Sequence, residues 1–162
     1  MQRTCQTTLI ALSWLTDSVP IDVSANWQEN SDMPCDTGSS LSLCSQRFFP
    51  DLDFSNVDPI YPDKSPATPY AYTREANKAR GEACLKDLYG RSEKVIAVVS
   101  HAGFLRTGIC RRRFANADFR IFTFGKGGEE ILIFEDEETE RRGGGMGRSE
   151  KGIFEVGEWE FP

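Results

Sequence analysis

One short run of apolar residues dominates the hydrophobic pattern of this chain. Residues 94–100, Lys-Val-Ile-Ala-Val-Val-Ser, are almost continuously apolar and rich in β-branched side chains. That composition is typical of a parallel strand that is covered on both faces. Small and polar residues follow it, and the apolar segment 104–110 can begin a helix. The pattern therefore predicts a buried strand, a tight turn and a helix in succession.

An amphipathic helix is expected near the start of the sequence, over residues 4–16. Its apolar side chains recur at helical spacing, which places Leu9, Leu12 and either Leu15 or Trp14 toward a core. A second helix is predicted over 73–90, because a threonine cap and an acidic first turn open this segment and a glycine closes it.

Two strands are predicted after the helix at 104–110. Residues 119–124 and 130–134 are rich in branched and aromatic side chains, and the glycine-rich segment 125–129 can join them as a hairpin. Helices that alternate with strands in this way indicate the α/β class.

Residues 20–69 are poor in helical periodicity and rich in Ser, Asp, Asn and Pro. A long irregular stretch inside a domain is either disordered or functional. We expect a short helix between Leu41 and Phe49, and we expect Trp27 and Phe54 to anchor the stretch on the core.

The end of the chain has a different composition. Residues 135–140 are almost all acidic, and the glycine-rich stretch 143–147 follows them. This composition predicts a flexible arm. The alternative is an arm that docks back through its apolar side chains, which are Phe154, Val156, Trp159 and Phe161. The expected organisation is one domain over 1–134 and a tail over 135–162.

Charge narrows the range of partners. The 162 residues carry a formal net charge of −6, with an isoelectric point near 4.9, which argues against nucleic acid as a partner. The basic run 111–113 is expected to be the solvated end of the helix that precedes it, where cations complement the helix dipole. The alternative is a rim that attracts anionic substrates.

The cysteines and the apolar segments indicate a cytoplasmic protein without metal or cofactor. The five cysteines lack Cys-x-x-Cys spacing and neighbouring histidines, so neither a zinc site nor a disulfide framework is predicted. The apolar stretch 9–15 is too short to span a bilayer and lacks the basic start of a secretory signal. No membrane partner is therefore expected.

His101 is the only histidine, and it falls in the turn between the predicted strand and helix. Free backbone N–H groups and the helix dipole attract anions at such a place. The small neighbours Ser100, Ala102 and Gly103 let a ligand approach the backbone closely. The alternative is a packed structural histidine. We expect a phosphate group or a small phosphorylated molecule as the ligand.

Residues 100–106, Ser-His-Ala-Gly-Phe-Leu-Arg, resemble the second-histidine motif of the histidine phosphatase superfamily, the phosphoglycerate-mutase-like proteins. Residues 3–7, Arg-Thr-Cys-Gln-Thr, are similar to the helix start whose arginine holds the substrate phosphate in that family. Residues 27–30 and 34–38 resemble the acidic loop of its fungal-type branch. Residues 114–122 agree as well, so the resemblance extends to about residue 124.

This resemblance implies a three-layer α/β sandwich of the phosphoglycerate-mutase-like type. It assigns His101 to the stabilisation of charge on the phosphoryl group, Glu29 to general acid catalysis, and Arg3 and the backbone at Ala102 to substrate binding. It also makes the irregular stretch a lid that selects the substrate.

The attacking histidine of that family lies in an Arg-His-Gly motif at the end of a central strand, and this chain contains no such motif. The sequence is therefore expected to lack the N-terminal central strand and, as given, to be inactive as a phosphatase, because no second imidazole can accept the phosphoryl group. Two hypotheses follow: an incomplete phosphatase domain, or a non-catalytic module that binds a phosphorylated ligand. The oligomeric state is left open.

Overall fold

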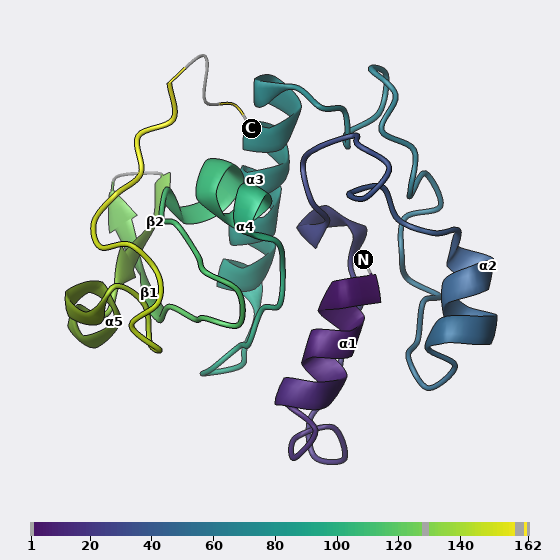
Figure 1. Ribbon diagram of the computed structural model, residues 1–162, viewed down its shortest axis with the longest axis horizontal. Coiled ribbons are helices and arrows are strands. Elements are labelled where there is room, and N and C mark those ends of the chain that lie inside the picture. Colours follow the sequence, from purple (N-terminus) through teal and green to yellow (C-terminus); the bar gives the residue numbers. More distant parts are fainter. Residues whose placement is uncertain (1, 128–129, 158–160, 162) are drawn as a thin grey trace.

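The computed structural model describes residues 2–127, 130–157 and 161. It combines helices with one antiparallel sheet of two strands (Figure 1). The helices longer than one turn are α1 (Gln2–Ala11), α3 (Arg74–Gly90) and α5 (Glu137–Arg142). The strands are β1 (Phe122–Gly127) and β2 (Glu130–Glu135).

Several short helical turns complete the fold. They are η1 (Ala25–Trp27), α2 (Leu41–Leu43), the π-helical turn η2 (Cys44–Phe48), α4 (Ala102–Phe104) and the π-helical turn η3 (Leu105–Cys110). The short helix expected between Leu41 and Phe49 is therefore present as α2 and η2. The helix expected after His101 is also present, as α4 continued by η3.

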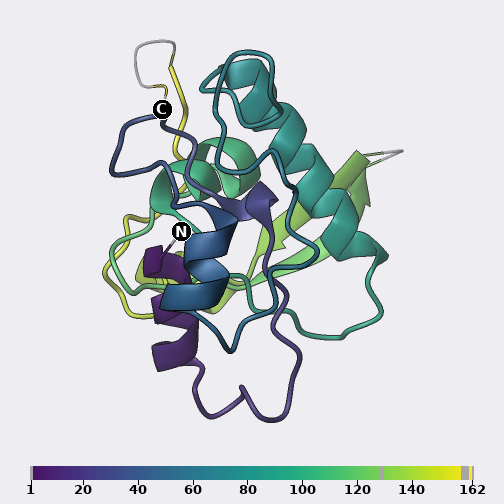
Figure 2. The same ribbon diagram turned by 90° about the vertical axis from the view of Figure 1, so that its right-hand side faces the viewer.

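The predicted hairpin is confirmed. Strands β1 and β2 pair in antiparallel register, with Phe122 opposite Glu135 and Phe124 opposite Ile133. The first strand lies three residues later than expected, and residues 128–129 of the connection are outside the described part. The hairpin packs beside α3 (Figure 2). The rings of Tyr89 and Phe124 meet there edge to face, with their centres 5.6 Å apart.

The predicted start of α3 is also confirmed. The Thr73 side chain accepts a hydrogen bond from the Ala76 amide at 3.1 Å, which satisfies one of the free donors of the first turn. The middle of α3 lies against η3 at two glycines. A Cβ atom on Gly81 would lie 1.8 Å from the carbonyl oxygen of Gly108, so only glycine permits this approach.

The three-layer sandwich is not observed, because the sheet has only two strands. Residues 94–100 were expected to form a buried strand, but in the described part of the chain they pair with no other strand. Figure 1 shows them as an extended connection between α3 and α4. Val95 is 89% exposed. A strand is defined by its neighbours, and this segment has an apolar composition without a neighbour to pair with.

The N-terminal helix also differs from the expectation. It ends at Ala11 and none of its described residues is buried. Its apolar side chains were expected to lie toward a core, but Leu9 is not buried in the structure. Trp14, which lies beyond the helix, is exposed.

The irregular stretch 20–69 contributes a core cluster of its own. Its buried members are Ala25, Val57 and Tyr61, which pack with Tyr70, and Phe54 lies against them as expected. The Tyr70 hydroxyl donates a hydrogen bond of 2.8 Å to the Asp58 carboxylate within this stretch.

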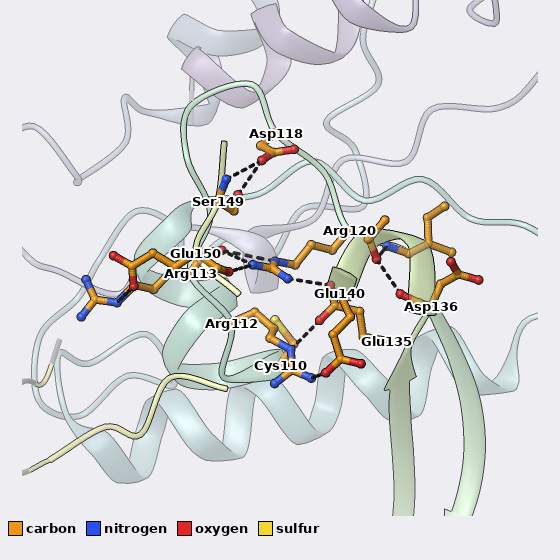
Figure 3. A network of polar contacts seen from close by, with 12 residues as sticks. Cys110, Arg112, Arg113, Asp118, Arg120, Glu135, Asp136, Glu140, Ser149 and Glu150 are labelled. Carbon is orange, nitrogen blue, oxygen red and sulfur yellow. Dashed lines mark hydrogen bonds and ion pairs between the residues drawn. The ribbon is translucent and has the colours of Figure 1, made fainter. Parts of the chain in front are cut away.

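The C-terminal segment packs against the domain, so a free arm is not observed. Asp118 accepts hydrogen bonds from the amides of Met146, Arg148 and Ser149, and one of 2.7 Å from the Ser149 hydroxyl (Figure 3). Partial burial raises the pKa of Asp118, but these hydrogen bonds outweigh it and lower the pKa to about 2.

Aromatic side chains of this segment dock as well. The ring of Phe154 lies under the guanidinium groups of Arg106 and Arg113, at 4.7 and 4.0 Å, and Phe161 stacks on Tyr72. Trp159, which was named with them as a docking residue, lies outside the described part.

The basic run 111–113 follows η3, and the side chains of Arg111 and Arg113 are exposed at this helix end, as expected, whereas Arg112 is buried. All three arginines pair with acidic side chains of distant segments. Arg111 pairs with Glu155, and Arg113 pairs with Glu150. Arg112 is buried and pairs with Glu135 at 2.5 Å and with Glu140 at 3.3 Å (Figure 3). Opposite charges far apart in the sequence meet here, which a local pattern does not reveal.

Glu135 is the centre of a buried ion network. Its second oxygen accepts a 2.6 Å ion pair from Arg120, and the side chains of Glu135 and Arg120 are 1% and 0% exposed. The guanidinium of Arg120 also donates to the backbone carbonyls of Arg113 and Glu150. One carboxylate thus compensates two buried cations at the end of β2.

Neutralising that carboxylate is expected to destabilise the fold strongly. In Glu135→Gln the fully buried Arg120 loses the carboxylate that pairs with it, and Arg112 keeps only the longer pair with Glu140. The loss of counter-charge around these buried groups costs about 3–5 kcal/mol. Urea unfolding measures the change. The matched control is Glu138→Gln, whose carboxylate is 61% exposed and pairs only with the exposed Arg141 and Arg142, so its cost should stay below about 1 kcal/mol. Equal losses in the two variants would contradict the network.

Candidate functional site

His101 lies at the start of α4, at the end of the extended segment 94–100. Its backbone is extended, so it occupies the cap position of the helix, and its side chain is buried. The neighbouring Ser100 hydroxyl donates a 2.8 Å hydrogen bond to the carbonyl of Trp27 in η1. The turn that contains His101 is therefore fixed to the beginning of the acidic loop.

Glu29 occupies the helix N-terminus next to His101. Its carboxylate oxygens accept hydrogen bonds from the amide of Phe104 at 2.8 Å and from that of Gly103 at 3.3 Å. A Cβ atom on Gly103 would lie 2.6 Å from this carboxylate, so a larger residue here would displace the Glu29 side chain from its present position. The amide groups that were expected to bind an external anion are thus taken by a carboxylate of the same chain.

The structure brings Glu29 and the His101 turn together, as the sequence predicts, but in a different arrangement. Glu29 caps the helix through both oxygens and also accepts from the Asn30 amide. A general acid has to present a proton to the leaving group. In the described geometry the Glu29 carboxylate acts as an acceptor of three amide hydrogen bonds, so its assignment as an acid remains a prediction.

Thr107 stabilises the contact between Glu29 and the start of α4. Its hydroxyl donates to the Gly103 carbonyl at 2.8 Å and accepts from the side-chain amides of Asn30 and Asn77 at 3.0 and 2.7 Å. The loop, α3 and the helical turn after His101 are joined at one hydroxyl.

The charge around His101 is positive. Burial is the main cause that lowers the pKa of His101, and the charges of Arg3 and Lys64 lower it further, while Asp36 raises it; the result is about 4. At neutral pH the imidazole is therefore uncharged. Its Nε2 atom is buried and has no hydrogen-bond partner in the part of the chain that the structure describes.

Arg3 lies near enough for its charge to lower the pKa of His101. Its side chain is 61% exposed and makes one ion pair, of 3.2 Å, with Asp36 of the acidic loop. Ala102, the other predicted binding residue, is the exposed first residue of α4. Three of the four predicted site residues interact around this turn: Glu29 through hydrogen bonds, and Arg3 and His101 through the effect of the Arg3 charge. Ala102 is near them because it follows His101 in the sequence.

Lys64 is a residue of this site that sequence analysis missed. Its buried ammonium group donates to three backbone carbonyls of the acidic loop, those of Glu29, Ser31 and Asp36. Burial, followed by the charge of Arg80, lowers the pKa of Lys64 to about 8. A single lysine between turn residues carries no sequence signal for such a role, because its three partners are main-chain atoms.

Arg80 is the second missed residue. It projects from α3 and is buried, with its guanidinium 4.1 Å from the centre of the Phe104 ring and one hydrogen bond to Asn77. Burial lowers the pKa of Arg80 to about 10. The nearby carboxylate of Glu29 favours its charged form, so Arg80 adds to the positive field behind the turn.

Comparison with known proteins found no family model, no curated protein and no solved structure that matches this chain. Within residues 2–127, 130–157 and 161, no group of three or more His, Cys, Asp or Glu side chains has a metal-binding arrangement. Over the same residues, every helix is too short or too polar to traverse a bilayer.

The buried neutral imidazole predicts a specific loss of stability in acid. The unfolded pKa of histidine is near 6.5 and the folded pKa of His101 is about 4. Between these values the unfolded state binds a proton that the folded state does not bind, so stability falls as pH is lowered through this window. At pH 5 the loss from this residue is about 2 kcal/mol relative to pH 7.5.

Urea unfolding at both pH values, on the wild type and on His101→Gln, isolates this contribution. The variant keeps the carboxylates and removes the imidazole, so its stability should fall less between pH 7.5 and pH 5, by about 2 kcal/mol. The same pH dependence in both proteins would show that His101 is not held neutral by burial.

Proposed function

We propose that this chain is a phosphoglycerate-mutase-like domain of the histidine phosphatase superfamily that binds a phosphate group at His101 and does not hydrolyse phosphate esters by itself. The observation that carries the proposal is the buried Nε2 atom of His101, which has no hydrogen-bond partner among the described residues. A buried polar atom without a partner is costly, and an oxyanion supplies one.

The local charges favour an anionic ligand. Arg3, Lys64 and Arg80 surround the turn with three cations, whereas Glu29 and Asp36 are the carboxylates on the same side. Arg3 alone among the three is largely exposed. It can exchange Asp36 for a phosphate oxygen with little rearrangement, because that ion pair is exposed and weak.

Protonation of the imidazole completes the proposed binding mode. A protonated His101 donates from Nε2 to a phosphate oxygen, and Arg3 provides a second charge-assisted hydrogen bond. Burial is the main cause that holds the ring neutral, and the neighbouring positive charges add to it; the anion offsets the effect of these charges. Binding of phosphate and uptake of a proton by His101 are therefore coupled, and each strengthens the other.

The sequence has no second histidine, so the proposed function is binding of phosphate without hydrolysis. Hydrolysis through a phosphohistidine needs one imidazole in line with the leaving group and other groups to stabilise charge. His101 can supply only one of these roles. The proposed ligand is an inorganic phosphate or a small phosphorylated molecule that stays intact.

Nuclear magnetic resonance of the single histidine tests this proposal directly. Titration of the His101 ring protons with pH should give a pKa near 4 without ligand, and inorganic phosphate at saturation should raise it by about one unit or more, since the anion stabilises the charged ring. Arg3→Gln should abolish the rise.

Arg141→Gln is the control, because Arg141 is exposed in α5 and pairs only with Glu138. It should leave the phosphate effect unchanged. A His101 pKa that does not respond to phosphate contradicts the binding site. Turnover of p-nitrophenyl phosphate that disappears in His101→Ala contradicts the non-catalytic assignment.

A further inference from the structure

Two extended segments of the chain run in the same direction on either side of a cavity. Residues 21–24 lead into η1, and residues 94–100 lead into α4. Near their starts, Arg91 pairs with Asp22 at 2.7 Å. At their ends, the Ser100 hydroxyl bonds to the Trp27 carbonyl at 2.8 Å. The segments are thus tied together at both ends and are parallel.

Between these ties the two backbones are not paired with each other. Within the described part of the chain, no backbone N–H or C=O group of residues 21–23 or 94–99 makes a hydrogen bond. Adjacent strands lie about 4.8 Å apart and pair spontaneously when they are in register. Two parallel extended segments that leave their main-chain groups unpaired present two open edges.

A cavity of about 570 Å³ lies along both segments. Its wall is mostly apolar. The two segments line it with Ile21, Val23, Ile96 and Val98, and the end of α3 adds Leu88. Thr4, Cys5 and Thr8 of α1 line it as well, together with Leu12 just after the helix. We name this space, bounded by the two segments and covered by α1, the strand groove. It also explains why α1 buries none of its described residues, because the helix lies over a cavity instead of a sheet.

The open backbone edges identify the kind of occupant. A small apolar molecule fills the volume but leaves the main-chain groups on both sides without partners. An extended peptide places side chains against the apolar wall and offers N–H and C=O groups to both edges at once. Only a β-strand satisfies the two requirements together.

The acidic charge at one end of the strand groove favours a peptide with a basic residue at that end. The carboxylates of Asp22, Asp87 and Glu93 line this end, and Arg91 is the one basic residue among the lining residues. Arg91 is shared between Asp22 and Glu93. Asp87 has no ion pair within the described residues, so a basic side chain at the end of the incoming strand finds a partner there.

We propose that the strand groove binds an extended apolar segment of another polypeptide, five or six residues long, with a basic residue at the end near Asp87. The segment adds a strand between residues 21–23 and residues 94–99. These two segments and the bound one then form a parallel or mixed sheet of three strands. This inference does not depend on phosphate binding, because the groove lies along the segments that precede the His101 turn.

The probe is a synthetic peptide with the sequence of residues 94–100, Lys-Val-Ile-Ala-Val-Val-Ser, with blocked ends. It has the required apolar, β-branched composition and begins with a lysine. Backbone hydrogen exchange of the full-length protein is measured by nuclear magnetic resonance with and without the peptide. We expect the exchange of the backbone amide hydrogens of residues 21–23 and 94–99 to slow at least tenfold. Some of these amides form new hydrogen bonds to the peptide, and the others lie next to such bonds.

Two controls separate strand pairing from simple adsorption. The same peptide with N-methyl groups on alternate amides has the same side chains but cannot donate to one edge, so it should not protect both segments. Val98→Asp, on the groove wall, should abolish protection, whereas Ile153→Asp, which is exposed and lies outside the groove, should retain it.

The opposite outcomes overturn the proposal. Protection of only one segment shows pairing at an outer edge, and equal effects of the N-methylated peptide show apolar adsorption. No protection at saturating peptide shows that the groove does not accept a strand. The peptide control requires no change in the protein, so the test stands even where a groove variant fails to fold.

Discussion

The contact between the Glu29 carboxylate and the N-terminus of α4 is the interaction on which the rest of the site depends. It joins the acidic loop to the amides of Gly103 and Phe104, 74 and 75 residues away in the sequence. Lys64 holds the loop from one side through three carbonyls, and Thr107 holds the helical turn from the other. His101 lies at the start of the helix that these contacts fix, and burial of its side chain is the main cause of its low pKa.

A second constraint explains most of the differences between the expected and the observed architecture. Residues 94–100 have the composition of a buried strand, but they have no neighbouring strand to complete their hydrogen bonds. The hairpin of β1 and β2 is therefore isolated, and α1 covers a cavity instead of a sheet. The C-terminal segment compensates in part, because its acidic residues and Phe154 cover the basic run 111–113.

Local signals in the sequence predicted local structure well. The threonine cap of α3, the glycine-rich hairpin and the turn at His101 depend on residues close to one another, and all three are present. The pairing of Arg112 with Glu135 and the clamp of Lys64 on three carbonyls depend on distant segments or on main-chain atoms. Neither carries a signal in composition or spacing. The capping role of Glu29 was missed for the same reason, although the residue itself was identified.

The measurement that tests this account most directly is hydrogen exchange at the amides of Gly103 and Phe104 in Glu29→Gln. Loss of the negative charge weakens two charge-assisted hydrogen bonds, by about 1–3 kcal/mol in all. The account predicts exchange at least tenfold faster at these two amides, with no change in Glu82→Gln, whose carboxylate is exposed on α3. Unchanged exchange at Gly103 and Phe104 in Glu29→Gln would contradict the account, because the helix would then be capped without Glu29.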